Sequence, residues 1–408
     1  MKSHYKTLGN YIREVTNINT DFSVNYLRGI SSIYKSFIKS KANIVGVDFL
    51  DYKIVHNDQF AFNPNTARMG DKIPIALNDG ENCIVSKIYP VFEIIDKQQL
   101  CPEYLMMWFK RSEFDRYARF KSHGSAREIF DWEEMCKVKL PIPTIDVQKK
   151  IVKEYNTIIN RIALNNQLIQ KLEETVQLIY KQWFVDFEFP DEEGKSFKSN
   201  GGEMVESEFG EIPIDWKVTK VKALCECNYA TLSPKDKFTT IEYLDTSNIT
   251  DNEIEEITTL NMQWDIIPSR AKRKVTHNDI IFSTVRPNLR HFGILKNINS
   301  NMIVSTGFAV LKATYPNLCS ELLYLTLIQE ENLQNLQAGA EMSVSTYPSI
   351  NPDDLMDIDF ILPARDILVK AKSVLIPCFD LLGNLQKEKK LLKSTSDIFL
   401  SKLATIEN

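Results

Sequence analysis

The chain of 408 residues is too long for one ordinary hydrophobic core and suits two domains with connecting elements. Its composition is 43% hydrophobic and 25% charged, with only 14 Gly and 16 Pro, which excludes extensive disorder. The formal net charge of −5 argues against a nonspecific polyanion binder, because such proteins are usually basic overall.

The first residues, Met1-Lys2-Ser3-His4-Tyr5-Lys6, lead into a polar stretch without the apolar core of a signal peptide. No run approaches membrane-spanning length, so we expect a cytoplasmic protein without a membrane partner. The seven cysteines are scattered, and the close pair Cys225 and Cys227 has no second pair or nearby His at zinc spacing. We interpret them as small buried hydrophobic residues.

Short β-branched or aromatic runs lie among polar turns, as in Asp279-Ile280-Ile281-Phe282 and Ile303-Val304-Ser305, and they predict strands. Helices are predicted over Pro102 to Tyr117 and Ser320 to Leu336. The globular parts should therefore be mixed α and β.

Five short matches recur in the same order at offsets of 217 to 222 residues, which indicates a tandem duplication. They pair Tyr26-Leu27 with Tyr243-Leu244, Asn57-Asp58 with Asn278-Asp279, Ile84-Val85-Ser86 with Ile303-Val304-Ser305, Tyr104-Leu105 with Tyr324-Leu325, and Leu140-Pro141 with Leu362-Pro363.

A long helix of about 40 residues is predicted after the first unit, because seam residues recur in steps of four and three. The series is Ile151, Tyr155, Ile158, Ile162, Asn165, Ile169, Leu172, Val176, Ile179 and Trp183. Asn165 is its only polar member. Two interpretations remain open: a buried amide that fixes the helix register, or a slip of the pattern toward solvent.

A second, weaker seam follows the second unit: Leu368, Ala371, Leu375, Cys378, Leu382, Leu385, Lys389, Leu392, Ser396, Phe399 and Leu403. Pro377 should kink or interrupt this helix, and Gly383 weakens it further. Each seam needs a partner, and we expect the two helices to pack on each other antiparallel.

Three segments stand out: Val138-Lys139-Leu140-Pro141-Ile142-Pro143 with Gln148-Lys149-Lys150-Ile151, then Lys181-Gln182-Trp183-Phe184-Val185-Asp186-Phe187, and Gly210-Glu211-Ile212-Pro213-Ile214-Asp215-Trp216. Together they resemble the specificity subunit of type I restriction-modification enzymes. They are similar to the family's link into its first long helix, the close of that helix, and the opening of the second recognition domain. The second copy departs from the pattern: Leu362-Pro363-Ala364-Arg365-Asp366 lacks the second proline and the Gln.

The resemblance implies an α+β fold with two mixed α/β target-recognition domains separated by two long helices that form an antiparallel coiled coil. The expected division is residues 1–145 for the first recognition domain, 146–188 for the central helix, 189–362 for a linker and the second domain, and 363–408 for the last helix. Each domain would read one half of a split target in double-stranded DNA, and two methyltransferase subunits would dock on the helices. Restriction subunits, with ATPase and nuclease activity, would join through the complex. S-adenosylmethionine, ATP and Mg would be bound by these partners, with no cofactor on this chain.

No catalytic motif stands out. Asn63-Pro64-Asn65-Thr66 fails the adenine methyltransferase pattern, and a phosphate-binding loop is missing. Pro190-Asp191-Glu192-Glu193-Gly194-Lys195 resembles a nuclease motif only superficially, because its acids crowd into one polar linker. Arg286 and His291 have the spacing of some helical ribonucleases, but Pro287 disfavours a helix between them.

Base edges are read by fork-shaped or amide side chains, while Lys, Ser and Thr more often hold phosphates. The first-half candidates are Asn63, Asn65, Thr66, Arg68 and Lys72, followed by Lys121, Ser122, His123, Ser125 and Arg127. The second-half candidates are Ser283, Thr284, Arg286, Asn288, Arg290 and His291, followed by Ser343, Ser345, Thr346 and Tyr347. The two sets occupy equivalent places in the repeat and overlap the basic stretches 110–127 and 270–296.

The leading hypothesis is therefore a noncatalytic, sequence-specific DNA-recognition subunit. One alternative is a nuclease or methyltransferase with an unrecognised active site. Another is a coiled-coil scaffold that binds no nucleic acid, for which loss of Arg68 and Arg286 would leave DNA affinity unchanged.

Overall fold

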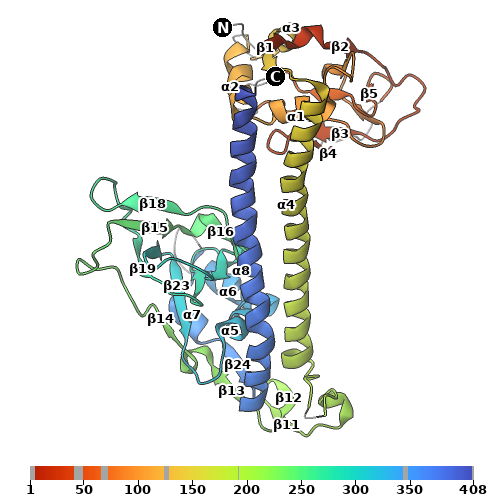
Figure 1. The fold of residues 1–408 in the computed structure, drawn as a ribbon. Helices are drawn as coiled ribbons and strands as arrows, with labels where there is room; N and C mark the ends of the chain where they lie inside the picture. Colours follow the sequence, from red (N-terminus) through yellow and green to blue (C-terminus); the bar gives the residue numbers. More distant parts are fainter. Residues whose placement is uncertain are drawn as a thin grey trace. The chain divides into compact units, whose positions relative to one another are not determined.

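The computed structural model describes residues 5–40, 49–65, 72–123, 128–191, 193–342 and 348–406. The chain forms two compact units (Figure 1): the first takes in the chain up to Leu164 and from Lys390 onward, and the second is Asn165–Lys389. Each unit thus contains a stretch of both long helices, whereas the division expected from the sequence treats the helices as separate segments.

The first unit is built on a four-stranded antiparallel sheet with the order β2 (Ile12–Val15), β9 (Val91–Ile94), β6 (Phe60–Phe62) and β7 (Ile75–Leu77). Three two-stranded pairs accompany it: β1 (Tyr5–Thr7) with β10 (Lys139–Pro141), β3 (Arg28–Ile30) with β4 (Phe37–Lys39), and β5 (Lys53–Val55) with β8 (Cys83–Val85). Its short helices are α1 (Pro102–Phe109), α2 (Ser112–Lys121) and α3 (Trp132–Lys137).

The second unit repeats this plan, with a four-stranded sheet in the order β14 (Cys225–Cys227), β23 (Phe308–Ala313), β20 (Ile280–Ser283) and β21 (Phe292–Ile294). A second sheet has the order β18 (Thr258–Asn261), β15 (Thr240–Leu244), β22 (Met302–Ser305) and β19 (Ala271–Lys274). The strand pairs are β13 (Lys217–Lys220) with β24 (Asp359–Leu362), β11 (Met204–Ser207) with β12 (Gly210–Pro213), and β16 (Ile249–Thr250) with β17 (Glu253–Ile254). The short helices are α5 (Ser320–Leu327), α6 (Glu330–Met342) and α7 (Pro352–Met356).

The order β2-β9-β6-β7 and the order β14-β23-β20-β21 are the same arrangement of equivalent strands. Phe60 pairs with Leu77 and Phe92, just as Ile280 pairs with Ile294 and Leu311. The strands predicted at 279–282 and 303–305 form as β20 and β22. Topology therefore supports the duplication that the short matches indicated.

One of those matches is out of register. The amide of Leu8 donates to the carbonyl of Val138 (2.8 Å), and the amide of Val221 donates to that of Ile358 (3.0 Å). Val138 is thus equivalent to Ile358, which moves the counterpart of Leu362-Pro363 two residues beyond Leu140-Pro141. Residues two apart point to the same face of a strand, so the apolar match survives the shift.

Helices form over both predicted ranges, 102–117 and 320–336, but each range holds two helices separated by a short break. Arg111 has extended backbone angles (φ −71°, ψ 140°) and ends the helical run between α1 and α2. Its guanidinium lies 4.2 Å from the centre of the Trp108 ring and its side chain is buried. The equivalent break separates α5 from α6 at residues 328–329.

The long helices are α4 (Ile145–Tyr180, 36 residues) and α8 (Arg365–Lys402, 38 residues), and they pair antiparallel within each unit. In the first unit the rings of Tyr155 and Phe399 lie 6.0 Å apart, and in the second Asn165 Nδ2 donates to Glu388 Oε2 (2.9 Å). Every residue of both predicted seams is buried or half-buried. Asn165 is fully buried, so the alternative that it faces solvent is wrong.

Pro377 lies inside the continuous helix α8, so the predicted interruption is wrong. Its ring lies on the exposed side of the helix, where water can satisfy the carbonyl that loses its amide partner. Gly383 serves a close approach, because a Cβ there would lie 2.8 Å from Lys296 Cβ.

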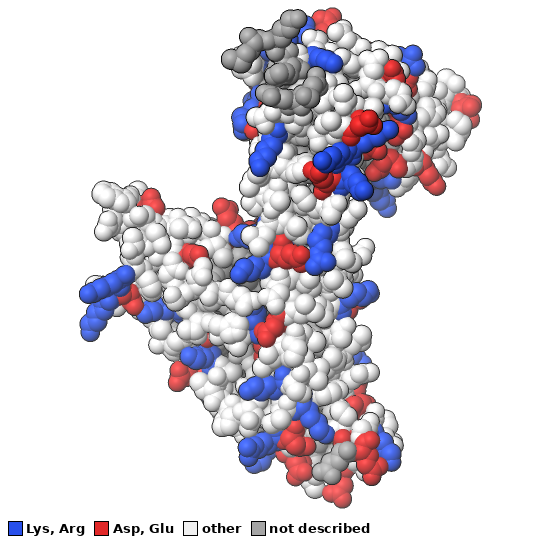
Figure 2. Space-filling model, viewed as in Figure 1, with Lys and Arg blue, Asp and Glu red and all other residues white. Residues whose placement is uncertain are grey.

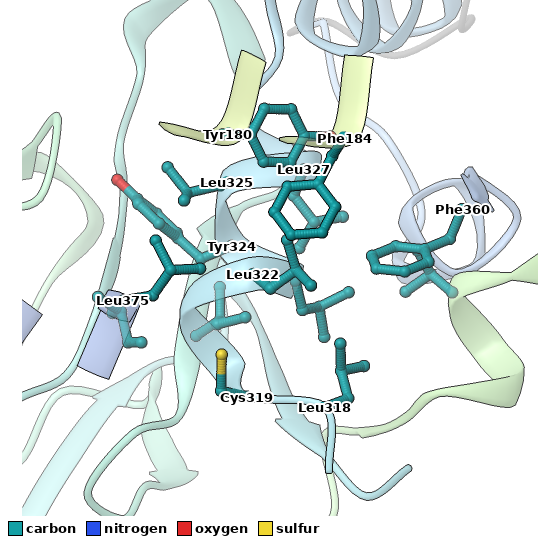
Figure 3. Packing of buried hydrophobic residues seen from close by; sticks show 14 of the residues in the cluster. Tyr180, Phe184, Leu318, Cys319, Leu322, Tyr324, Leu325, Leu327, Phe360 and Leu375 are labelled. Atoms are coloured by element: carbon teal, nitrogen blue, oxygen red, sulfur yellow. The ribbon is translucent and has the colours of Figure 1, made fainter. Parts of the chain in front are cut away.

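The core of the second unit gathers apolar side chains from α4, α5 and α8 (Figure 3). Tyr180 at the end of α4, Phe184 in the helical turn that follows (Lys181–Val185) and Leu375 of α8 lie around α5. Tyr180 Oη also donates to Thr326 Oγ1 (3.2 Å). The seam therefore belongs to the globular core rather than being a free-standing coil.

Lys296 forms an ionic triad in this unit with the buried Glu321 and the half-exposed Asp380. Its Nζ lies 2.5 Å from Glu321 Oε1 and 2.9 Å from Asp380 Oδ1, and the Lys296 and Glu321 side chains are only 4% and 1% exposed. The triad connects the end of β21 to α5 and α8.

We predict that Lys296→Met lowers the free energy of unfolding by about 3–5 kcal/mol, because it leaves the Glu321 carboxylate buried without a cation. Adding Glu321→Gln should restore much of the loss. Lys195→Met, which removes an exposed partner of Glu193, should change it by less than about 1 kcal/mol. Urea denaturation followed by circular dichroism measures this, and equal midpoints for both single variants would contradict it.

Candidate nucleic-acid interface

In the second unit, the candidate segment at the end of β20 pairs with residues 348–350, which directly follow the other candidate segment. The amide of Ile350 donates to the carbonyl of Thr284, and the amide of Arg286 donates to that of Pro348, both at 2.9 Å. Val285 and Ser349 form an antiparallel bridge between these bonds. Residues 284–286 and 348–350 are therefore one short ladder, which we call the second reader ladder.

The first unit has the equivalent ladder. Asn65 bridges Ile129, and the amide of Phe130 donates to the carbonyl of Pro64 (2.8 Å). His123 bridges the other side of Ile129. We call residues 63–65, 123 and 128–130 the first reader ladder. The sequence placed these segments at matching points of the repeat but gave no sign that they pair.

Eight candidates lie outside the described residues, namely Thr66, Arg68, Ser125, Arg127, Ser343, Ser345, Thr346 and Tyr347. The other twelve candidates lie within the described residues.

Three candidates turn inward and hold the backbone. Ser283 is 2% exposed and its hydroxyl donates to the Val285 carbonyl (3.0 Å). Both the amide and the hydroxyl of Thr284 donate to the carbonyl of Gly307, at 2.9 and 3.0 Å. In the first unit the buried Asn63 side chain accepts the amide of Asn65 (3.1 Å). The hydrogen bonds of these three side chains therefore hold the backbone of the two ladders in place.

Two described candidates of the second unit are exposed, Arg286 in the second reader ladder and Asn288 two residues beyond it. They flank Pro287 in a single 3-10 turn (Pro287–Leu289), so no α-helix places Arg286 against His291. Arg286 has φ +49°, a left-handed conformation that costs a non-glycine residue free energy and is often retained at functional positions. The amide of Asn288 donates to Gln337 Oε1 of α6 (3.2 Å), and its side chain is exposed.

Arg290 and His291 are held by protein partners. Arg290 Nε lies 2.5 Å from Asp251 Oδ1, and its Nη1 lies 3.4 Å from Glu330 Oε2. His291 Nδ1 lies 2.6 Å from the Ile249 carbonyl, so this ring nitrogen carries the proton. Both side chains fasten the turn to the β16–β17 hairpin.

The first unit presents basic residues near the end of α2. Lys72 and His123 are exposed, and Lys121 Nζ lies 5.7 Å from the ring of Phe120. Ser122 Oγ caps α2 by donating to the Ala118 carbonyl (2.7 Å). Phe120 is 81% exposed. It was not singled out from the sequence, because an aromatic residue in a predicted helix is usually interpreted as part of the hydrophobic core.

A buried clamp also escaped the sequence. Lys35 and Asp115 form an ion pair in which both side chains are nearly inaccessible. Lys35 Nζ donates to the Ile73 carbonyl and Asp115 Oδ1 accepts the Ile73 amide, both at 3.0 Å. Burial lowers the pKa of Lys35, while the Asp115 carboxylate opposes that shift. The clamp fixes the chain directly after Lys72.

The described residues offer little for catalysis. Asp191 Oδ1 accepts the amides of Glu193 and Lys195 (2.9 and 2.8 Å), so it organises a turn. All seven cysteines are free and buried or half-buried, and burial raises the pKa of the Cys225 thiol to about 12. Within the described parts of the chain, no three His, Cys, Asp or Glu side chains are grouped to hold a metal ion. No helix there is long and apolar enough to span a membrane.

Charged side chains of both signs are mixed on the face of the molecule seen in Figure 2. On the face in Figure 2, Lys and Arg lie among Asp and Glu instead of forming one continuous basic field. Contact with a polyanion would therefore be local to segments such as the reader ladders.

Residues 12–174 match the family of the type I restriction modification DNA specificity domain. The chain is 23% identical over 322 residues to the specificity subunit of the type I restriction enzyme MjaIX from Methanocaldococcus jannaschii, covering 76% of this chain and 70% of that relative. It is 23% identical over 166 residues to the HindI specificity subunit from Haemophilus influenzae, covering 41% of this chain but only 36% of that relative.

The fold is similar to the crystal structure of the S subunit of a type I restriction-modification system from M. genitalium. The TM-score is 0.59 over 99% of this chain and 96% of that one, at 13% identity. At this identity the similarity concerns the fold alone.

We predict that Gly307→Ala destabilises the second unit by about 1–3 kcal/mol, because the added Cβ would lie 2.8 Å from Thr246 Cγ2. Thr246→Ser removes that methyl group and should restore most of the stability in the double variant. Gly339→Ala in α6, whose Cβ would meet nothing within 4 Å, should be neutral or stabilising. Urea midpoints test this, and a Gly307→Ala variant as stable as Gly339→Ala would refute the steric account.

Proposed function

We propose that the chain is a specificity subunit of a type I restriction-modification enzyme and that it recognises a bipartite DNA target for catalytic subunits made by other chains. Each unit reads one half of the target through its reader ladder. The chain itself is noncatalytic and acts by positioning its partners.

The observation that carries this proposal is the repeated ladder. The same bridge follows the equivalent strands β6 and β20, at Asn65 with Ile129 and at Val285 with Ser349. The residues around the bridges differ, with an Asn-Pro-Asn segment in one unit and Arg286 with Asn288 in the other. Amide and guanidinium groups recognise different base edges in the major groove. Equivalent frames with different polar side chains suit two different half-sites.

The partners dock on the long helices. Large apolar side chains remain exposed outside the seam, with Leu164, Leu168 and Leu178 on α4 and Leu391 and Ile398 on α8 at 41–62% exposure. The separations of four and seven residues in Leu164/Leu168 and Leu391/Ile398 keep each pair on one helix face. We assign these faces to two methyltransferase subunits, with restriction subunits joining through the complex. Those subunits bind S-adenosylmethionine, ATP and Mg. The complex acts in the cytoplasm.

Arg286→Ala should weaken binding of the assembled complex to its target duplex by roughly tenfold to a hundredfold, because a guanidinium can donate two hydrogen bonds to one base. Selectivity at one position of one half-site should relax. Arg13→Ala, which removes an exposed Arg of β2, is the matched control and should bind as the unaltered complex does. Titrations with the target duplex and with single-base variants measure both effects.

If the Arg286→Ala complex keeps the affinity and selectivity of the unaltered complex, Arg286 does not have this role. Cleavage or methyl transfer by the purified chain alone would instead favour an enzyme.

Removing one heptad from each long helix, residues 157–163 and 391–397, should shorten the gap between the half-sites. Seven helical residues span roughly 10 Å, the rise of about three base pairs. Both half-sequences should stay unchanged, because the deletions leave both sheets intact. Methylation mapping in cells carrying the variant shows the new motif, and an unaltered gap in an active complex would reject the helices as the spacer.

A further inference from the structure

The loop between β18 and β19 of the second unit exposes two large apolar side chains. Trp264 is 81% exposed and Ile266 is 95% exposed. The other four tryptophans of the chain, Trp108, Trp132, Trp183 and Trp216, are buried or half-buried. We call residues 263–266 the apolar tip.

The tip is held in place by its own chain. Asp265 Oδ2 accepts the amide of Asn261 (2.7 Å), and the amide of Asp265 donates back to the Asn261 carbonyl (3.0 Å). Asn261 Oδ1 also accepts the amide of Gln263 (2.9 Å). Met262 and Ile267, on either side, pack on the small core around Tyr243 and Ile303. The flanking residues thus anchor the loop, while Trp264 and Ile266 remain outside that core.

The loop returns to the sheet beside the second reader ladder. The amide of Thr306 donates to the carbonyl of Arg270 (2.8 Å), and the next residue, Gly307, accepts both donors of Thr284. One turn therefore touches the base of the loop and the first residue of the ladder. The apolar tip and Arg286 are presented by adjoining segments of one unit.

The charge around the loop suits DNA. Residues 262–274 contain Arg270, Lys272, Arg273 and Lys274 but only one acid, Asp265. Arg270 and Lys272 are exposed, while Lys274 is paired with Asp236. An apolar side chain flanked by cations is the combination that packs into the minor groove of DNA or against unstacked bases.

We propose that Trp264 and Ile266 pack against DNA next to the half-site read by the second unit, adding affinity that does not depend on base sequence. Arg270 and Lys272 hold the adjacent phosphates. This inference rests on the proposed function, because it requires that the second ladder faces DNA.

The test uses the assembled complex and a duplex carrying the motif found by methylation mapping. Trp264→Ala should weaken binding about tenfold, to the motif and to an unrelated duplex alike, whereas Trp264→Phe should keep most of the affinity. The dependence of affinity on salt should stay unchanged in Trp264→Ala, because no phosphate contact is lost, and Lys272→Ala should lower its log–log slope by about one. The control is Ile214→Ala, which removes a half-exposed apolar side chain elsewhere in the unit.

A second readout locates Trp264 directly. DNA should protect from acrylamide quenching the part of the tryptophan emission that is lost in Trp264→Phe. Normal binding by Trp264→Ala, together with weakened binding by Arg286→Ala, would overturn the inference and leave the proposed function standing. Loss of methyltransferase subunits from the Trp264→Ala complex would also overturn it, because the tip would then contact protein. A wild-type complex that fails to bind the duplex would overturn the proposed function itself.

Discussion

The antiparallel seam between α4 and α8 is the contact on which both units depend. It supplies Tyr155 and Phe399 to the first unit, and Ile169, Val176, Leu375 and Leu382 to the core of the second. Asn165 is the costly member, since its Oδ1 is buried with no hydrogen-bond partner among the described residues while its Nδ2 donates to Glu388. Leaving such an acceptor unpaired costs about 1–3 kcal/mol. A polar seam residue can still be retained because it disfavours other registers of the two helices, and register decides which surfaces the helices present.

Duplication explains how one chain presents two comparable surfaces, and the differences between the copies explain how those surfaces can differ in specificity. The sheets share strand order and pairing, so the bridges at Asn65 and Val285 fall at the same point of each fold. The supports around them are not shared. A Lys35–Asp115 clamp fixes the first copy beside its ladder, whereas Arg290 fastens the turn of the second to Asp251 and Glu330. A common frame with local differences lets side chains at the ladders vary while the strand pairing around them stays the same.

The long helices and the duplication could be predicted from the sequence because both leave a regular spacing of residues. The steps of four and three in both seams gave the long helices, and the matches near an offset of 220 gave the duplication. Local exceptions were harder. Pro377 suggests a break by its chemistry alone, and only its exposed position shows why α8 continues. Arg111 looks like an ordinary helical residue until its contact with Trp108 is known.

The candidate site was predicted less completely than the fold, for a physical reason. Polar side chains in a loop look alike in sequence whether they face solvent or hold the backbone, so Ser283 and Arg286 were equally good candidates. Burial and hydrogen bonds separate them, with Ser283 turned inward and Arg286 exposed in a strained conformation. The Lys35–Asp115 pair joins residues 80 positions apart, and no periodicity reveals such a contact.

The central claim is that the two units are interchangeable readers on equivalent frames. It is tested most directly by replacing residues 218–363 with a second copy of residues 5–143, whose ends occupy equivalent positions in β1, β13 and the starts of the long helices. Methylation mapping of cells that carry this chimera together with its catalytic partners gives the result. The account predicts a symmetric motif in which both halves are the half-site of the first unit. A chimera that assembles and methylates DNA but keeps the original second half-site would contradict it.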